Sequence, residues 1–166
     1  MKKSIAIFIA ILGFLNFSMA QKKVASPAET ATGKINEATI TINYGSPSVK
    51  GREIWGKLVP FDKVWRAGAN DATTFETDKE ITVEGTKLPA GKYSFFVIPN
   101  EKECTLVFSK QKDQWGAYDY KEKEDQLRVK VTPKAKTEST EKLVYTIATT
   151  SVVLSWEKWD IGFSVK

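Results

Sequence analysis

The chain of 166 residues has 25 basic and 20 acidic residues, a formal net charge of +5, one cysteine and no histidine. Without histidine, the commonest general base, the commonest metal ligand and every Ser-His or Cys-His nucleophile pair are excluded. Because Cys104 is the single cysteine, neither an intramolecular disulfide nor a transition-metal site is expected. We therefore expect no cofactor and no metal, and the mild positive charge gives no reason to expect nucleic acid as a partner.

The first twenty residues have the layout of a signal peptide. Lys2 and Lys3 precede a nearly unbroken apolar stretch from Ile5 to Phe17, and Ala20 completes the small-residue pattern of a cleavage site. The apolar stretch is shorter than the ~20 residues that span a bilayer, so we predict cleavage after Ala20 and no membrane span. The mature chain, which loses two lysines and no acid, then carries a net charge of +3. We expect it to be exported in soluble form, to the periplasm or the exterior.

Beyond the cleavage site, the chain reads as a leader followed by strands. Residues 21–34 are small, polar and aperiodic, which predicts a flexible leader. From residue 35 the dominant pattern is the alternation of apolar and polar residues that is typical of half-buried strands. Residues 93–98 (YSFFVI) are apolar on both faces and predict a central strand covered on both sides. The alternating runs predict further strands at residues 37–44, 80–84, 104–109, 126–132, 143–148, 152–157 and 159–165, the last two as a hairpin.

Many short strands separated by turns indicate one all-β domain over residues 35–166. At this length they predict a single antiparallel β-sandwich, either jelly-roll or immunoglobulin-like. The charged run at residues 121–125 and the polar stretch at residues 133–142 have the composition of solvated connections, and we assign neither a binding role.

Residues 46–72, which we call the flap, carry little strand pattern but are dense in tryptophan, arginine and glycine. Structureless segments longer than about 12 to 15 residues are uncommon in compact domains and are usually functional loops or disordered. The flap has enough apolar residues to pack onto a sandwich, so we expect one long ordered loop over an end or face. Gly68, between two alanines, predicts a close approach to another strand or to a ligand.

The polar residues of the flap that we expect to converge are Arg52, Arg66, Asn70 and Asp71. An arginine there can bind a carboxylate or phosphate of a ligand in a bidentate fork, or it can pair with Asp71 and hold the loop. The structural pairing is the favoured interpretation of the two.

A second candidate segment, residues 114–120 (QWGAYDY), is aromatic and turn-forming, and we call it the aromatic turn. Trp115 and Tyr118 can stack on sugar faces or cover the edge of the core, and cover of the core is the favoured interpretation. The acids closest in sequence to the two segments are Asp62, Asp71, Glu76 and Asp119. Their spacing does not indicate a pair at the separation that a glycosidase requires.

Four separated blocks of the chain carry a family resemblance. They are YGSPSVKGR at residues 44–52, the stretches LVPF and VWRAGANDATT between residues 58 and 74, LPAGKY at residues 88–93 and WGAY at residues 115–118. In this combination the chain resembles domain-of-unknown-function family 2911, which is typical of secreted Bacteroidetes proteins, over residues 35–165. Asp71 stands where many members are expected to have glutamate. The resemblance implies export and a β-rich single domain, and it supplies no catalytic residue.

The function predicted from the residues is a non-catalytic binding module of the cell envelope for a small polar or glycan ligand. The alternatives are a histidine-free hydrolase or lyase working through carboxylates, and an envelope scaffold without a small ligand. The oligomeric state is left open. The residues expected around the pocket are Arg52, Trp65, Arg66, Asn70, Asp71, Trp115 and Tyr118.

Overall fold

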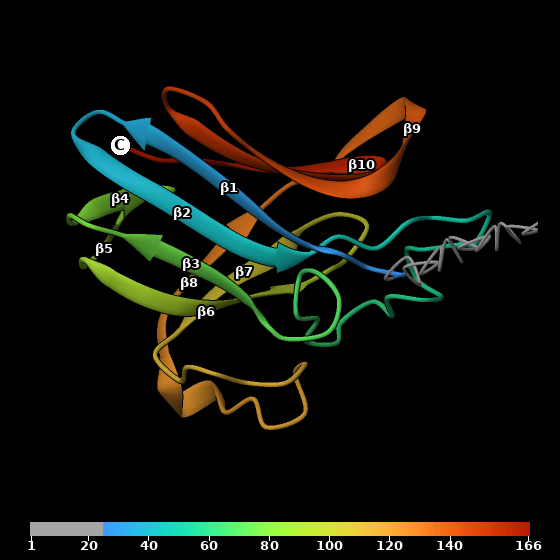
Figure 1. Ribbon diagram of the computed structural model, residues 1–166, viewed down its shortest axis with the longest axis horizontal. Helices are drawn as coiled ribbons and strands as arrows, with labels where there is room; N and C mark the ends of the chain where they lie inside the picture. Colours follow the sequence, from blue (N-terminus) through green and yellow to red (C-terminus); the bar gives the residue numbers. More distant parts are fainter. Residues whose placement is uncertain (1–24) are drawn as a thin grey trace, which may run out of the picture.

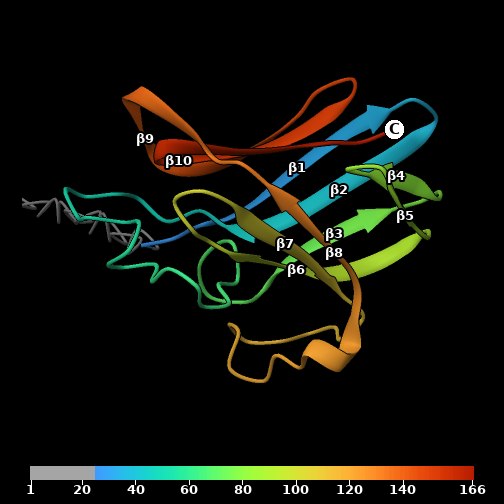
Figure 2. The same cartoon turned by 180° about the vertical axis from the view of Figure 1, so that it is seen from behind.

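The computed structural model describes residues 25–166, and the predicted signal peptide, residues 1–20, lies outside the described residues. Strands β9 (Lys134–Ile147) and β10 (Ser151–Ser164) pair with each other and cover one face of a six-stranded antiparallel sheet (Figures 1 and 2). The facing surfaces of the two sheets share one apolar core. The predicted all-β sandwich is therefore confirmed.

The six-stranded sheet follows the chain in the order β1-β2-β3-β6-β7-β8. A short hairpin, β4 with β5, is inserted between β3 and β6 and forms a small sheet of its own. Across residues 25–166 this meander has no Greek-key crossing, so its topology is simpler than that of a jelly roll or an immunoglobulin domain. The strands are β1 (Ala28–Ile35), β2 (Ala38–Gly45), β3 (Thr73–Thr77), β4 (Ile81–Val83), β5 (Thr86–Leu88), β6 (Gly91–Ile98), β7 (Cys104–Ser109) and β8 (Asp125–Val131).

The alternation of the sequence correctly predicts which side chains enter the core. In β2, for example, Ala38, Ile40, Ile42 and Tyr44 are buried between the sheets. Strand β6, predicted to be covered on both sides, lies between β3 and β7 and is buried from Tyr93 to Val97. The centre of the sandwich is an aromatic cluster with ring centroids 5.1 to 6.3 Å apart, made of Phe75, Phe95, Phe108 and Phe163.

The predicted flexible leader is wrong over most of its described length, because Ala28–Ile35 form strand β1. All eight residues of β1 pair with β2. The backbone hydrogen bonds of this pairing order a segment whose side chains, apart from Ile35, are not buried. An edge strand of this kind lacks the apolar alternation that reveals a half-buried strand.

The last part of the chain also differs from the prediction. Residues 152–157 and 159–165 do not form a hairpin with each other, since β10 is one long strand that continues past Glu157 and pairs with β9. Glu157 has a φ of 50° at a register shift, so a β-bulge accounts for the interrupted alternation. The partner strand β9 includes most of residues 133–142, which we predicted to be a solvated connection. Pairing with β10 orders these residues, although the side chains of most of them stay exposed.

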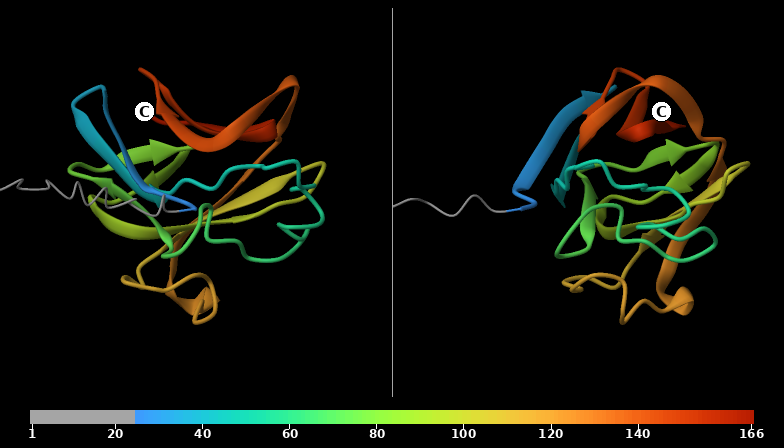
Figure 3. Two further views of the ribbon diagram at one scale, coloured as in Figure 1. Left: turned by 45° about the vertical axis from the view of Figure 1, so that its right-hand side comes forward. Right: turned by 90° about the vertical axis from the view of Figure 1, so that its right-hand side faces the viewer.

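The flap closes one end of the sandwich and touches both sheets (Figure 3). Ser48 pairs with Lys142 of β9, and Trp65 pairs with Val97 of β6. Between these two attachments, Trp55 packs edge to face against Trp156 of β10, with ring centroids 6.1 Å apart. The expected long ordered loop is thus confirmed, with its apolar residues serving as the packing surface.

Two further features concern the described chain as a whole. Cys104 is fully buried at the start of β7, and burial raises the pKa of its thiol.

Within residues 25–166, no helix is long and apolar enough to cross a membrane.

The aromatic cluster should dominate the stability of the sandwich. We expect Phe75→Ala to lower the free energy of unfolding by about 3–5 kcal/mol, because the cavity it leaves is enclosed by three other rings. Val144→Ala, at an exposed position of β9, is the control and should change it by about 0.5 kcal/mol or less. Urea unfolding followed by tryptophan fluorescence measures both. Equal losses in the two variants would contradict the proposed core.

Candidate functional site

The flap is fixed at Ala67, whose backbone carbonyl accepts hydrogen bonds from both sheets. The Tyr145 hydroxyl of β9 donates at 2.8 Å and the Thr73 hydroxyl of β3 donates at 3.0 Å. Ala67 is fully buried and has a φ of 53°, a conformation that is costly for alanine and persists only where its surroundings impose it. Burial also raises the pKa of Tyr145 well above its usual value, so this hydroxyl keeps its proton.

Next to this anchor, the flap crosses β2 at very close range. A side-chain Cβ at Gly45 would lie 2.2 Å from the carbonyl oxygen of Ala69, and one at Gly68 would lie 3.0 Å from the carbonyl oxygen of Gly45. Both positions therefore require glycine for reasons of space. The close backbone approach predicted around Gly68 is confirmed, and its partner is a strand.

The outer face of the six-stranded sheet, turned away from β9 and β10, carries a continuous polar row. One residue of each strand occupies the row, and each is paired in register with the next. Exposure decreases along the row from the edge strand β1 to the covered strand β7. In sheet order the row consists of Thr30, Asn43, Thr74, Ser94, Ser109 and Asp125.

A hollow of about 480 Å³ lies over the exposed half of this row, and we call it the polar hollow. This volume is within the range of about 300–1,000 Å³ that is usual for small-molecule sites. Its floor is the sheet, and its wall is formed by the flap and the start of the aromatic turn. The lining includes Glu29, Thr30, Asn43, Thr74 and Lys92 from the sheet, Asn70 and Asp71 from the flap, and Asp113 and Gln114.

Neighbouring residues of the floor are hydrogen-bonded to each other. The Thr30 hydroxyl donates to Asn43 Oδ1 at 2.8 Å, and Asn43 Nδ2 donates to Thr74 Oγ1 at 3.4 Å. These bonds hold the polar groups of three strands in one array. Hydroxyl groups can each donate once and accept twice, so the array retains capacity for further hydrogen bonds.

Gln114 lines the polar hollow and also carries a buried acceptor. Its side chain is held by a bond from Nε2 to the carbonyl oxygen of Gln111 at 3.1 Å. The residue is only 6% exposed, yet its Oε1 has no hydrogen-bond partner among the described residues. A buried acceptor without a partner costs about 1–3 kcal/mol, and such groups in native structures call for an explanation such as a bound molecule.

A second, smaller hollow of about 250 Å³ lies where the flap meets the other half of the aromatic turn, and we call it the basic hollow. Arg66 and Lys63 are its charged residues, and no acidic residue lines it. The rest of its lining is apolar or aromatic and includes Leu58, Pro60, Val64, Trp65, Ala117 and Tyr118.

Backbone contacts join the flap to the aromatic turn at the boundary between the two hollows. Asp71 pairs with Trp115, and the Ala72 amide donates to the Gln114 carbonyl at 2.9 Å. In the aromatic turn, Gln114 before Trp115 lines the polar hollow, and Ala117 and Tyr118 after it line the basic hollow. The residues predicted to share one pocket are therefore divided between two neighbouring ones.

Of the seven predicted residues, Asn70 and Asp71 line the polar hollow, and Trp65, Arg66 and Tyr118 line the basic hollow. Arg52 belongs to neither, because its guanidinium donates to the carbonyls of Ser48 and Val49 and so fastens its own turn. The favoured pairing of an arginine with Asp71 is wrong, since neither Arg52 nor Arg66 forms an ion pair with it in the described structure.

The predicted role of Trp115 and Tyr118 as cover for the core is wrong. They are 65% and 78% exposed, and their rings stack on each other with centroids 5.6 Å apart and an angle of 12°. The cover is provided by Ala117 and Tyr120, which pack on the outward-facing Phe96 of β6. Trp65 points the other way, into the core, where its ring stacks on Trp156 at 5.8 Å.

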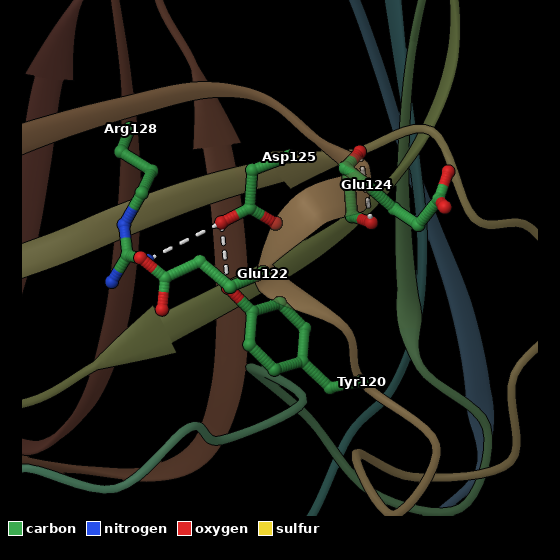
Figure 4. A network of polar contacts seen from close by, with 6 residues as sticks. Tyr120, Glu122, Glu124, Asp125 and Arg128 are labelled. Carbon is green, nitrogen blue, oxygen red and sulfur yellow. Dashed lines mark hydrogen bonds and ion pairs between the residues drawn. The ribbon is translucent and has the colours of Figure 1, made fainter.

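The charged run that was predicted as a solvated connection contains a buried carboxylate. It includes a short 3₁₀ helix, η1 (Glu122–Glu124), and ends at Asp125, whose side chain is only 7% exposed. The Tyr120 hydroxyl donates to Asp125 Oδ2 at 2.6 Å, and Arg128 Nη1 lies 3.4 Å from the same oxygen (Figure 4). Burial raises the pKa of the Asp125 carboxyl, although Tyr120 and Arg128 act in the opposite direction.

The remaining candidate acids are dispersed. Asp62 accepts a hydrogen bond from Asn100 at 2.9 Å, and Asp119 is exposed on the aromatic turn. Instead, Glu29 and Asp113 join Asp71 around the polar hollow. In residues 25–166, no three histidine, cysteine or acidic side chains lie close enough together to hold a metal ion.

The crossing at Gly45 gives a test of how the flap is seated. We expect Gly45→Ala to lower the free energy of unfolding by about 2–3 kcal/mol, because the new methyl group would collide with the Ala69 carbonyl. Gly162→Ala is the matched control, since its methyl group would meet only ordinary contacts of 3.5 Å or more, and a change of about 1 kcal/mol or less is expected. Chemical denaturation measures the free energy of unfolding of both variants. Equal losses in the two would contradict the close approach of the flap to β2 at Gly45.

The buried Asp125 carboxyl predicts a pH dependence of stability. Because its pKa is higher in the folded than in the unfolded state, its stabilising contribution is complete below the unfolded value of about 3.9 and is lost as the pH rises through the folded value. The Asp125→Asn variant has no carboxyl group to titrate here and does not lose this stability. We therefore expect the free energy of unfolding of the variant to increase relative to that of the parent protein as the pH rises from 3 to 7.

Denaturant titrations at several pH values would measure this difference. In a protein that keeps Asp125, Tyr120→Phe should enlarge the fall in the free energy of unfolding between pH 3 and 7. The reason is that the hydrogen bond from Tyr120 lowers the pKa of Asp125. A constant difference between Asp125→Asn and the parent at every pH would contradict the assignment.

Comparison with known proteins places the chain in a family. The model of a family described as a protein of unknown function, DUF2911, matches residues 26–165. No curated protein and no solved structure matches the chain. The family blocks in the flap and the aromatic turn are the segments that build both hollows. Since the match covers most of its length, the chain belongs to the family of proteins of unknown function DUF2911.

Proposed function

We propose that the protein is an exported, non-catalytic binding module of the cell envelope, and that its polar hollow holds a sugar residue of a glycan. The observation that carries the proposal is the array of hydroxyl and amide groups on the floor of the polar hollow. The signal-peptide layout of residues 1–20 supports export.

A sugar suits this hollow because its hydroxyl groups both donate and accept hydrogen bonds. The floor offers hydroxyl and amide groups of both kinds. The lining carries three carboxylates and one ammonium group, so its negative balance opposes a strongly anionic ligand. The volume of about 480 Å³ suits a small ligand.

The arrangement also favours binding over internal pairing. The Thr74 hydroxyl has a hydrogen bond from Asn43 only, and Asp71 has no hydrogen bond or ion pair from its side chain within the described residues. A scaffold would gain nothing from leaving such groups around a hollow, whereas a binding site needs them free for a ligand.

A glycan array probed with the mature protein, followed by calorimetry on the glycans that bind, tests the proposal. We expect Thr74→Val to weaken binding about tenfold, because it removes one hydroxyl from the floor with little change of shape. Thr41→Val is the matched control, since Thr41 is on the same outer face of β2 but does not line the polar hollow. Absence of any glycan binder, or equal affinities of the two variants, would refute the proposal.

The second candidate is a histidine-free hydrolase, and one observation favours it. Glu29, Asp71 and Asp113 line the same hollow, and glycosidases work with a pair of carboxylates. All three are exposed, whereas the general acid of such enzymes is prepared by burial in apolar surroundings, so binding is the preferred function. A panel of 4-nitrophenyl glycosides distinguishes the two: hydrolysis by the parent protein that is lost in Asp71→Asn would establish the enzyme.

A further inference from the structure

The basic hollow is a separate feature with different chemistry, and its central residue is Arg66. The chain has three arginines, and the guanidinium groups of the other two have partners within the protein. Arg52 donates to backbone carbonyls, and Arg128 pairs with Glu122 at 2.7 Å and with Asp125 at 3.4 Å. Arg66 has no ion pair with any described residue, and its buried Nε has no hydrogen-bond partner there.

A partly buried guanidinium without a counter-ion costs free energy unless a ligand supplies the charge. The backbone carbonyl of Arg66 accepts a hydrogen bond from the Thr73 amide at 3.2 Å, and its side chain extends toward Gly116, where Nη1 would lie 3.8 Å from an added Cβ. The ring of Tyr118 lies 3.0 Å from the same point. The free guanidinium and the exposed ring of Tyr118 thus both lie close to Gly116.

We propose that the basic hollow is a second ligand site, which binds a small carboxylate carried on an aromatic or apolar body. The guanidinium of Arg66 would pair with the carboxylate in its own plane, since planar bidentate pairing is what arginine offers. Lys63 adds a second positive charge, and the absence of acidic residues from the lining removes any repulsion. The body of the ligand would lie on the apolar lining beside Tyr118.

The chemistry of the site selects this class of ligand over other anions. Apart from Arg66, Lys63 and the Tyr118 hydroxyl, the lining has no polar side chain, so we expect a mostly apolar ligand with one small planar anionic group that the guanidinium can bind in its own plane. At about 250 Å³ the hollow is smaller than the usual range for drug-sized ligands. The ligand is therefore expected to be of the size of benzoate or phenylacetate.

Titration of the full mature protein with benzoate, phenylacetate, the matching neutral amides and phenyl phosphate tests the proposal. Calorimetry gives the affinities, and the ¹H–¹⁵N signal of Arg66 Nε, assigned with Arg66→Lys, reports binding at this guanidinium. We expect the carboxylates to bind at least about tenfold more tightly than the amides, because a hydrogen bond to a charged group contributes about 1.5–3 kcal/mol. The Arg66 Nε signal should shift with the carboxylates only.

Variants separate this site from general charge effects. Arg66→Met should lower carboxylate affinity at least about tenfold, whereas Lys57→Met, which removes the same charge from the flap outside the hollow, should leave it unchanged. Tyr118→Ala, at an exposed position that threatens folding little, should weaken binding about fivefold through lost ring contact. Glycan binding in the polar hollow should persist in all three variants.

Several outcomes would overturn the proposal. They are equal affinities for benzoate and its amide, an Arg66 Nε signal that does not move, tighter binding of phenyl phosphate than of benzoate, and an unchanged affinity in Arg66→Met. None of these outcomes bears on the polar hollow, so the glycan proposal and this one stand or fall separately.

Discussion

The structure depends on one backbone oxygen. The carbonyl of Ala67 receives hydroxyl donors from β3 and from β9, so a single acceptor ties both layers of the sandwich to the flap. Residues immediately before Ala67 line the basic hollow, and those immediately after it line the polar hollow. The strained φ of Ala67 is maintained because two buried donors require the carbonyl to face them. Both candidate sites are therefore positioned by the two hydrogen bonds to the Ala67 carbonyl, although Ala67 itself lines neither hollow.

The outer face of the larger sheet explains why there are two hollows of opposite character. Across the same strands, the polar row is followed by an apolar patch around Phe96 and Val107. The aromatic turn covers the apolar patch and leaves the β1 side of the row open, so a polar surface remains beside a covered one. The flap contributes to both hollows, because its residues up to Arg66 line the basic hollow and its residues from Ala69 onward line the polar hollow. The two ligand classes that we propose follow from this division.

The sequence predicts the sandwich and its core well, because burial on one face imposes a period of two that is visible in the residues themselves. Ile40, Ile42 and their counterparts in the other predicted strands are buried as expected. Strand β1 and the first half of β9 could not be predicted in this way, because their exposed side chains carry no alternation and only the pairing with a neighbouring strand orders them.

For the candidate sites, the sequence identifies the right segments but not the right grouping. The flap and the aromatic turn do build both hollows, and Arg66, Asn70 and Asp71 all line one of them. The floor of the polar hollow was missed, because Thr30, Asn43 and Thr74 look like ordinary solvent-facing strand residues until the register aligns them. A buried acceptor such as Gln114 Oε1 has no signature in sequence either, since its lack of a partner is a property of packing.

The buried position of Cys104 has a practical consequence. A thiolate is the reactive form of cysteine, and burial both hides this thiol and raises its pKa. The folded protein is thus protected from oxidation and from crosslinking to another copy, even in surroundings that favour disulfides. The same thiol becomes available as soon as β7 leaves the sandwich, so the rate at which a thiol reagent labels Cys104 reports how often the native fold opens.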